Sequence, residues 1–365
     1  MAAAHRLTEL NRERRLDLAV TLREAGDRFG GVIETERRDG FVLEGGPDAF
    51  LSGKPWAVEL CRRIGLGEEL IETRPNFRRL FVLRGERMVE FEQCEEELRQ
   101  ELGRRVYGME AGAPRYDRFV TPREGMGRLV DRLIERMPDV DRRTGVPAKT
   151  VRPELVEGRT KWNVRLENGE SLKADALCLA LPAVAAASLI RPFASQAAAV
   201  LEQVPYAPVA SVNLGFREED LPQLPEGFGY LVPAKEAKTV LGCTFSSWKF
   251  SNRAPEGAFL LRAFVGGPFH PEAVDREETE LVDAVRQELR LHLGLNAEPR
   301  LVWVRRYRNA VPLPSADRPA GLDGLEKALA PWPGLWLIGN AYHGVGIPDC
   351  VHSAEAAAER IADEV

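Results

Sequence analysis

Two glycine-containing turns, one near each end of the chain, constrain the fold more than any other feature of the sequence. Near the N-terminus, a short apolar stretch over residues 18–22 is closed by Glu24 and followed by the neighbouring glycines Gly30 and Gly31. Near the C-terminus, the apolar stretch 335–338 runs into Gly339 and a loop. If both turns bind one ligand, the fold must bring the two ends of the chain together.

Each turn has the chemistry of a nucleotide site. A carboxylate that closes a strand, as Glu24 does, can accept hydrogen bonds from both ribose hydroxyls of an adenine nucleotide. Glycines let the backbone approach a pyrophosphate closely, and Arg28 adds positive charge for its phosphates. A glycine loop between a strand and a helix start directs free amides at a bound anion, which the helix dipole also favours. The alternative is a pair of ordinary turns without a ligand.

Composition excludes several classes of function. A chain of 365 residues with 44% hydrophobic residues can bury a large core and form more than one domain. Its net charge of -6 argues against nucleic-acid binding, which needs a basic face. Five scattered cysteines form no Cys-x-x-Cys pair, so neither a disulfide framework nor a metal site is expected. No run reaches the ~18 apolar residues of a membrane span. We therefore expect a cytoplasmic protein that is soluble or at most peripheral to a membrane.

The hydrophobic patterns predict an α/β fold in which one region is all strand. Strands over 161–166 and 172–181 flank Asn168-Gly169, which predicts a hairpin. Four later strands follow one another with short turns and no helices between them, and this predicts a separate antiparallel sheet. These strands cover 209–216, 229–232, 240–245 and 259–265. Helices are predicted over 1–15, 55–63, 125–136, 276–293 and 348–362.

The two turns and the segment 44–50, Glu-Gly-Gly-Pro-Asp-Ala-Phe, resemble the flavin-binding segments of a known family. This is the family of bacterial protoporphyrinogen and coproporphyrinogen oxidases of haem synthesis, within the FAD-dependent amine-oxidase-like superfamily. Segments 205–210, 244–250 and 264–267 extend the resemblance over most of the chain. It implies oxidation of coproporphyrinogen III or protoporphyrinogen IX to the porphyrin by hydride transfer to FAD, with molecular oxygen as the final acceptor.

The resemblance also implies which residues bind FAD. Glu24 would hold the adenosine ribose, and Tyr307 stands where the family usually carries a tryptophan near the flavin. Residues 46–49 would lie beside the isoalloxazine, and backbone amides of 345–347 would face the ring. The complete predicted set is Glu24, Ala25, Arg28, Gly30, Gly31, Gly46, Pro47, Asp48, Ala49, Ala148, Tyr307, Gly339, Asn340, Val345, Gly346 and Ile347. No catalytic acid or base is assigned.

By the same resemblance, a Rossmann-like FAD-binding domain would carry an inserted, reduced antiparallel-sheet substrate domain. The FAD-binding domain would combine 1–90, 143–188 and 319–365, the substrate sheet would cover 189–318, and 91–142 would be a remnant of a helical substrate region. Since one FAD must touch both turns, Glu24 and the loop 345–347 should lie at neighbouring parallel strand ends.

The chain also departs from the family pattern. The family's glycine-rich phosphate turn would precede Met1, and a long helical part would lie between Phe91 and Glu92, so the resemblance implies a chain truncated at the N-terminus and internally deleted. Pro312-Leu313-Pro314 replaces a Pro-Gln-Tyr, and Ala354 replaces a glycine. Two alternatives therefore remain beside the oxidase. One is an amine oxidase of the same fold, and the other is a non-catalytic or impaired flavin- or porphyrin-binding remnant.

Overall fold

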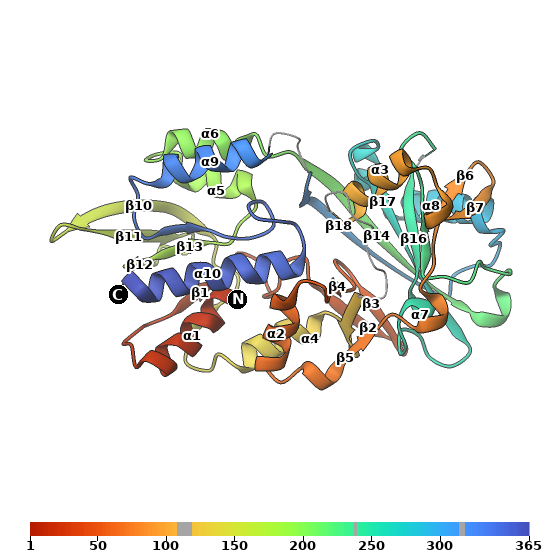
Figure 1. The fold of residues 1–365 in the computed structure, drawn as a ribbon, viewed down its shortest axis with the longest axis horizontal. Coiled ribbons are helices and arrows are strands. Elements are labelled where there is room, and N and C mark those ends of the chain that lie inside the picture. The colour runs from red at the N-terminus through yellow and green to blue at the C-terminus, as the bar shows by residue number, and fades with distance from the viewer. Residues whose placement is uncertain (108–118, 237–238, 314–317, 365) are drawn as a thin grey trace.

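One large sheet forms one end of the molecule (Figure 1). The computed structural model describes residues 1–107, 119–236, 239–313 and 318–364, and within them this sheet has the strand order β18-β14-β17-β16-β15-β6-β7. Neighbouring strands are antiparallel, except that β15 and β6 are parallel. The strands are β6 (Leu80–Arg84), β7 (Arg87–Glu90), β14 (Tyr206–Arg217), β15 (Gly229–Leu231), β16 (Val240–Phe245), β17 (Ala258–Gly266) and β18 (Leu301–Pro312).

The long strands of this sheet present different chemistry on their two faces. Side chains alternate along a strand, so Val212 and Leu214 of β14 lie on one face, where they join an apolar core with helix α8 (Glu278–Leu293). Ser211 and Asn213 lie on the other. The pairing register places Asn213 opposite Arg262 of β17, and Ser211 opposite Arg305 of β18. A polar row therefore crosses three strands on the face away from α8.

The opposite end of the molecule contains smaller sheets. Two parallel pairs, β1 (Thr21–Arg23) with β9 (Asp141–Arg143) and β13 (Leu177–Leu179) with β19 (Leu335–Leu337), are not hydrogen-bonded to one another. An antiparallel sheet of β10 (Ala148–Val156), β11 (Arg159–Leu166) and β12 (Ser171–Ala174) lies beside them.

Helices α1 (Ala2–Arg14) and α10 (Ile347–Glu364) lie side by side at this end, although they come from opposite ends of the chain (Figure 1). Alanines make the contact close. Ala3 of α1 packs in one apolar cluster with Ala354 of α10, and Leu10 packs with Ala358. The expected meeting of the two ends of the chain is therefore confirmed.

A third group of elements lies between the two ends (Figure 1). The hairpin β2 (Thr35–Arg38) and β3 (Phe41–Glu44) is antiparallel, and β8 (Phe119–Pro122) pairs with both β4 (Phe50–Leu51) and β5 (Leu70–Glu72). Helices α2 (Pro55–Arg63) and α4 (Gly127–Glu135) share an apolar core with β4, β5, β8 and α1.

The remaining helices pack on the faces of the sheets or connect their strands. A layer of α5 (Ala183–Ile190), α6 (Ser195–Glu202) and α9 (Arg318–Leu329) forms an apolar cluster with the buried Trp162 of β11. Helix α3 (Glu96–Tyr107) packs through Leu98 and Leu102 on β6, and α7 (Ser246–Lys249) is a short helix after β16. Within the described ranges, no helix is long and apolar enough to cross a bilayer.

The mixed α/β fold and the antiparallel sheet are confirmed, but two details of the prediction are wrong. The stretch 172–181 is not one strand, because it breaks at Asp175 and Ala176 into β12 and β13, which belong to different sheets. Strands β6 and β7 come from segment 1–90, yet they extend the large sheet instead of the small ones. Their apolar residues, such as Val82, pack under α3 at the far end of the molecule.

Candidate cofactor site

The centre of the candidate site is the loop 44–49 between β3 and β4, because buried side chains of the large sheet hold its backbone. Ser211 Oγ donates a hydrogen bond to the peptide oxygen of Gly45 at 2.7 Å. Arg262 Nη2 donates to the same oxygen at 3.2 Å and also to the peptide oxygen of Gly46. The polar row of the sheet thus fixes which way these two peptides face.

Glu44 fastens the start of this loop. Its carboxylate accepts hydrogen bonds from Thr35 Oγ1 at 2.7 Å and from the Met126 amide at 2.8 Å, while its peptide oxygen accepts one from Asn213 at 3.1 Å. Burial raises the pKa of Glu44, and the positive charge of Arg253 opposes only part of that effect. Because Met126 is the N-cap residue of α4, Glu44 ties the loop to the start of that helix.

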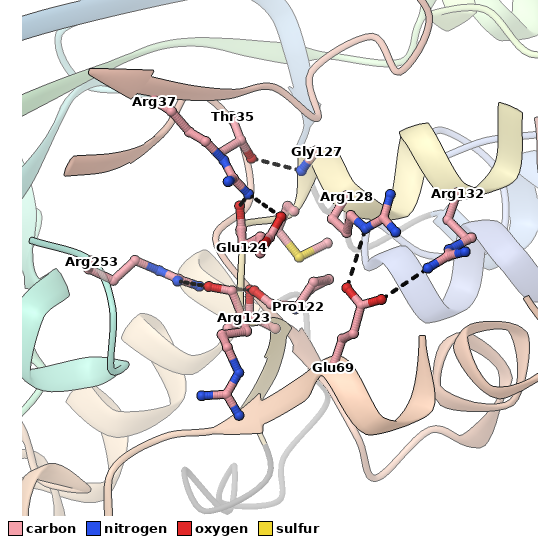
Figure 2. Close-up of polar contacts among 12 residues, drawn as sticks. Thr35, Arg37, Glu69, Pro122, Arg123, Glu124, Gly127, Arg128, Arg132 and Arg253 are labelled. Atoms are coloured by element: carbon pink, nitrogen blue, oxygen red, sulfur yellow. Dashed lines mark hydrogen bonds and ion pairs between the residues drawn. The ribbon is translucent and has the colours of Figure 1, made fainter. Parts of the chain in front are cut away.

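Arg253 and Thr35 hold the turn between β8 and α4 (Figure 2). The buried Arg253 donates to the peptide oxygens of Arg123 at 2.9 Å and of Pro122 at 3.4 Å. The Gly127 amide donates to Thr35 Oγ1 at 2.7 Å. Ion pairs at the outer face of α4 join Glu69 to Arg128 and Arg132.

An ion pair between the buried Lys249 and the half-buried Asp48 lies at the end of the loop. Lys249 Nζ donates to both carboxylate oxygens of Asp48, at 2.9 and 2.8 Å. The ammonium also lies near aromatic rings. Its Nζ atom is 4.9 Å from the centroid of the Phe119 ring. Burial raises the pKa of Asp48, but the charges of Lys249 and Arg262 outweigh it, so the pKa lies below its usual value. Asp48 is therefore ionised at neutral pH.

A second charged group lies on the other side of Gly45. Glu34 forms a two-point contact with Arg305, at 2.9 and 2.7 Å, and binds Arg28 at 3.2 Å. Burial alone would raise the pKa of Glu34, but the two arginines lower it. Arg28 also donates to the peptide oxygen of Ile33 at 2.9 Å. The Arg28 guanidinium, which was predicted to bind phosphates, is thus already bound to protein groups. It would have to bind a phosphate in addition to these groups.

Several features of the site fit a bound flavin nucleotide. The hydroxyl of Tyr307 is buried and has no hydrogen-bond partner among the described residues, and a Cβ placed on Gly45 would lie 2.7 Å from it. Burial raises the pKa of Tyr307, so its hydroxyl is protonated and can donate. Gly31 and Gly339 have φ angles of 58° and 124°, and a Cβ on either would point into open space. These positions leave room for a ligand close to the backbone.

The structure brings the turn at Glu24 beside the segment that leads to Ala148. The Glu24 amide donates to the peptide oxygen of Arg143 at 3.0 Å, and the Val146 amide donates to that of Glu24 at 3.0 Å. The Glu24 carboxylate accepts a hydrogen bond from the Gly26 amide at 2.8 Å. Glu24 and Ala148, predicted to lie near ribose and adenine, are therefore in the same part of the fold.

The C-terminal turn contacts residues that follow the loop 44–49 in the chain. Asp349, in the first turn of α10, binds Lys54 at 2.6 Å, and Ile347 packs in the same apolar core as Phe50. The expectation that Glu24 and the loop 345–347 lie at neighbouring parallel strand ends is wrong, because β1 and β19 belong to different sheets. Strand β1 pairs with β9, and β19 pairs with β13, and α1 packs against both pairs instead.

Polar residues of the large sheet and of α7 also contact the candidate site, and the sequence prediction missed them. Their partners lie far away in the chain. They are the buried Ser211, Asn213, Lys249 and Arg262 and the partly exposed Arg305. The usable signal was the alternation of Ser211 and Asn213 with apolar residues in the predicted strand 209–216. Polar residues at every second position of a buried strand indicate a polar contact on one face.

The chain matches the flavin containing amine oxidoreductase family over residues 1–111 and 95–362. The two matched stretches overlap over residues 95–111, shortly after the break expected behind Phe91. Coproporphyrinogen III oxidase of Bacillus subtilis (strain 168) is 25% identical over 449 aligned positions, which cover 98% of this chain and 94% of that protein. Because the alignment is longer than the 365 residues here, that relative has segments without a counterpart in this chain.

Other proteins show the same pattern. Coproporphyrinogen III oxidase of Propionibacterium freudenreichii subsp. freudenreichii is 27% identical, covering 94% of this chain and 86% of that protein. The solved structure of a proposed protoporphyrinogen oxidase from Exiguobacterium sp. 255-15 has a TM-score of 0.84 at 25% identity, covering 100% of this chain and 96% of that one. A putrescine oxidase structure matches with a TM-score of 0.73, and the match covers 100% of this chain and 96% of that one. Because its sequence identity is only 16%, this likeness shows the fold alone.

Proposed function

Because the chain belongs to the flavin containing amine oxidoreductases, we propose that it oxidises a porphyrinogen to the porphyrin with FAD as its cofactor. The observation that carries this proposal is the similarity to coproporphyrinogen III oxidases along 94–98% of the chain, which includes the large sheet as well as the small ones. Amine-oxidising proteins share the fold at much lower identity. Coproporphyrinogen III and protoporphyrinogen IX are both candidate substrates, because relatives named for either one align over 93–98% of the chain.

In this proposal, the residues predicted from the sequence bind FAD. Glu24, Ala25 and Ala148 hold the adenosine, while Arg28, Gly30, Gly31, Gly339 and Asn340 lie along the diphosphate. Gly46, Pro47, Asp48, Ala49, Tyr307, Val345, Gly346 and Ile347 surround the ring. When bound, FAD takes up hydride from the substrate and passes the electrons to molecular oxygen.

The chain's own side chains prepare the ring side of this site. Ser211 and Arg262 bind the peptide oxygens of the loop 44–49, so these acceptors are turned toward the sheet. The protonated Tyr307 hydroxyl supplies a donor beside Gly45. A buried donor without a partner costs free energy, and a hydrogen bond to an acceptor removes that cost. This hydroxyl can donate such a hydrogen bond to an oxygen or nitrogen atom of the flavin ring.

Flavin content and porphyrin formation test the proposal separately. Purified protein is denatured to measure released flavin, and native protein is then saturated with FAD. Porphyrin fluorescence is followed from coproporphyrinogen III and from protoporphyrinogen IX, with peroxide release from putrescine as the control reaction. We expect flavin uptake, porphyrin formation and no amine oxidation. Flavin uptake without porphyrin formation would indicate an impaired binder, whereas the absence of both would contradict the proposal.

Replacement of Tyr307 by phenylalanine tests the ring side of the site. Removal of one hydrogen bond should weaken FAD affinity by about 2–10-fold, because a net hydrogen bond contributes about 0.5–1.5 kcal/mol. The flavin-free variant should be as stable as the unsubstituted protein or more stable, since it no longer buries a lone hydroxyl. Titration by flavin fluorescence and urea unfolding measure the two effects. Tyr342→Phe also removes a buried hydroxyl without a partner among the described residues, and it should leave FAD affinity unchanged.

A further inference from the structure

Resting on the proposed flavin function, we propose that Arg262 is a positioning residue with an electrostatic role. It fixes the peptides of Gly45 and Gly46, and it gives the buried charges behind the loop 44–49 a net positive sign. This sign raises the reduction potential of the flavin ring that the loop contacts.

The first support is the position of Arg262 on the sheet. It lies on β17 opposite Asn213, is 2% exposed, and points away from the core shared with α8. Its Nη2 atom binds the peptide oxygens of both glycines. Among the described residues, no other side chain binds the peptide oxygen of Gly46, so Arg262 connects that peptide to the sheet.

The second support is the balance of buried charge. Two carboxylates, Glu44 and Asp48, lie among three cations, Lys249, Arg253 and Arg262. The charges act on one another, since Asp48 and Glu44 are the groups that oppose the effect of burial on Arg262. With every group ionised, the cluster carries one net positive charge.

The three cations have different partners, and this difference singles out Arg262. The Lys249 ammonium forms an ion pair with Asp48. Arg253 donates hydrogen bonds to peptide oxygens of the turn at Pro122 (Figure 2). Arg262 has neutral peptide oxygens as partners, and its Nε atom is buried without a hydrogen-bond partner in the described structure. Arg253 likewise has no carboxylate as a hydrogen-bond partner, but of these two arginines only Arg262 binds the loop 44–49, and its charge acts on Tyr307 as well.

A buried positive charge favours flavin reduction for a simple reason. Hydride brings two electrons and one proton, so the ring gains one negative charge, and a nearby cation stabilises that charge in a water-poor site. Arg262 should therefore have two separable effects. Its hydrogen bonds should affect how tightly FAD binds, and its charge should affect the potential.

A set of variants separates the two effects. Arg262→Met removes both the hydrogen bonds and the charge, and Arg262→Lys keeps the charge. Ser211→Ala removes a hydrogen bond to the same Gly45 oxygen without changing any charge. Arg308→Gln is the control, because it removes an exposed arginine from β18. Each protein is saturated with FAD, its affinity is measured by flavin fluorescence, and its midpoint potential is measured against a reference dye.

We expect Arg262→Met to weaken FAD binding at least tenfold and to lower the midpoint potential. Arg262→Lys should bind FAD weakly but stay near the unsubstituted potential, and Ser211→Ala should affect affinity alone. If circular dichroism shows that Arg262→Met does not fold, Arg262→Gln replaces it, since glutamine removes the charge and keeps a donor.

Two results would overturn the inference while leaving the proposed function intact. One is an unchanged potential in a folded, FAD-loaded variant that lacks the Arg262 charge. The other is an equal fall of potential in Ser211→Ala, which would show that loop geometry and not charge sets it. If the unsubstituted protein takes up no FAD at all, the proposed function itself fails, and this inference fails with it.

Discussion

Lys249→Met should lower the free energy of unfolding by about 3–5 kcal/mol at neutral pH, because removal of one partner leaves the other charge buried and unpaired. The orphaned group is the carboxylate of Asp48, whose side chain is 18% exposed, while that of Lys249 is 7% exposed. Urea unfolding followed by circular dichroism measures the loss.

The loss should depend on pH in a defined direction. The pKa of Asp48 in the folded protein lies below its ordinary value, so the pair stabilises the fold above the unfolded pKa of about 3.9, and this contribution fades as the pH falls through the lower folded value. In Lys249→Met the pKa of Asp48 should rise, because burial is no longer opposed by the ammonium. The difference between the two proteins should therefore shrink as the pH is lowered from 7 toward 4.

Two controls bracket this result. The double variant Lys249→Met with Asp48→Asn carries no unpaired charge and should recover much of the lost stability. Arg37→Met breaks the ion pair with Glu124, in which both side chains are 53% exposed (Figure 2). It should cost less than about 1 kcal/mol, because water screens exposed pairs. An equal loss in both single variants would contradict the assignment of a buried pair.

Gly46→Ala should have the second large effect. A Cβ at this position would lie 1.9 Å from the peptide oxygen of Val32 and 2.8 Å from its carbonyl carbon, and both are backbone atoms that no rotamer change can move. Overpacking of this kind typically costs about 1–3 kcal/mol, and so close a contact should reach about 3 kcal/mol. The displaced loop should also bind FAD poorly.

Gly324→Ala is the matched control for this substitution. Gly324 lies within α9, and a Cβ there would meet no atom within 4 Å. Alanine should stabilise that helix by about 0.5–1 kcal/mol. Urea unfolding and flavin fluorescence of the two variants give the comparison, and retained FAD affinity in Gly46→Ala would show that the loop is not part of the cofactor site.

Local signals allowed much of the fold to be predicted. Helix α2 begins and ends at the predicted residues, Pro55 and Arg63, because a proline in its first turn and a regular apolar period mark it. The prediction of one strand over 172–181 was wrong. The strand breaks at Asp175 because its two halves join different sheets. No short-range pattern contains that information.

The candidate site divides in the same way. The backbone turns at Glu24 and Gly339 could be recognised, since their glycines and carboxylate carry the chemistry in consecutive residues. Arg262 and Lys249 could not be recognised from the sequence, because the role of a buried charged residue depends on the partner that it contacts in the fold. Asp48 lies 201 residues before Lys249 in the chain, and only the folded sheet brings the two together.

The two-faced sheet also sets an order of events during folding. The acceptors of the loop 44–49 find their donors on β14 and β17, and the Tyr307 hydroxyl reaches Gly45 only from β18. These strands are synthesised more than 150 residues later than the loop. A nascent chain on the ribosome therefore exposes its N-terminal turn long before the ring side of the site exists. For the proposed site, we therefore expect cofactor capture only after these distant strands have paired.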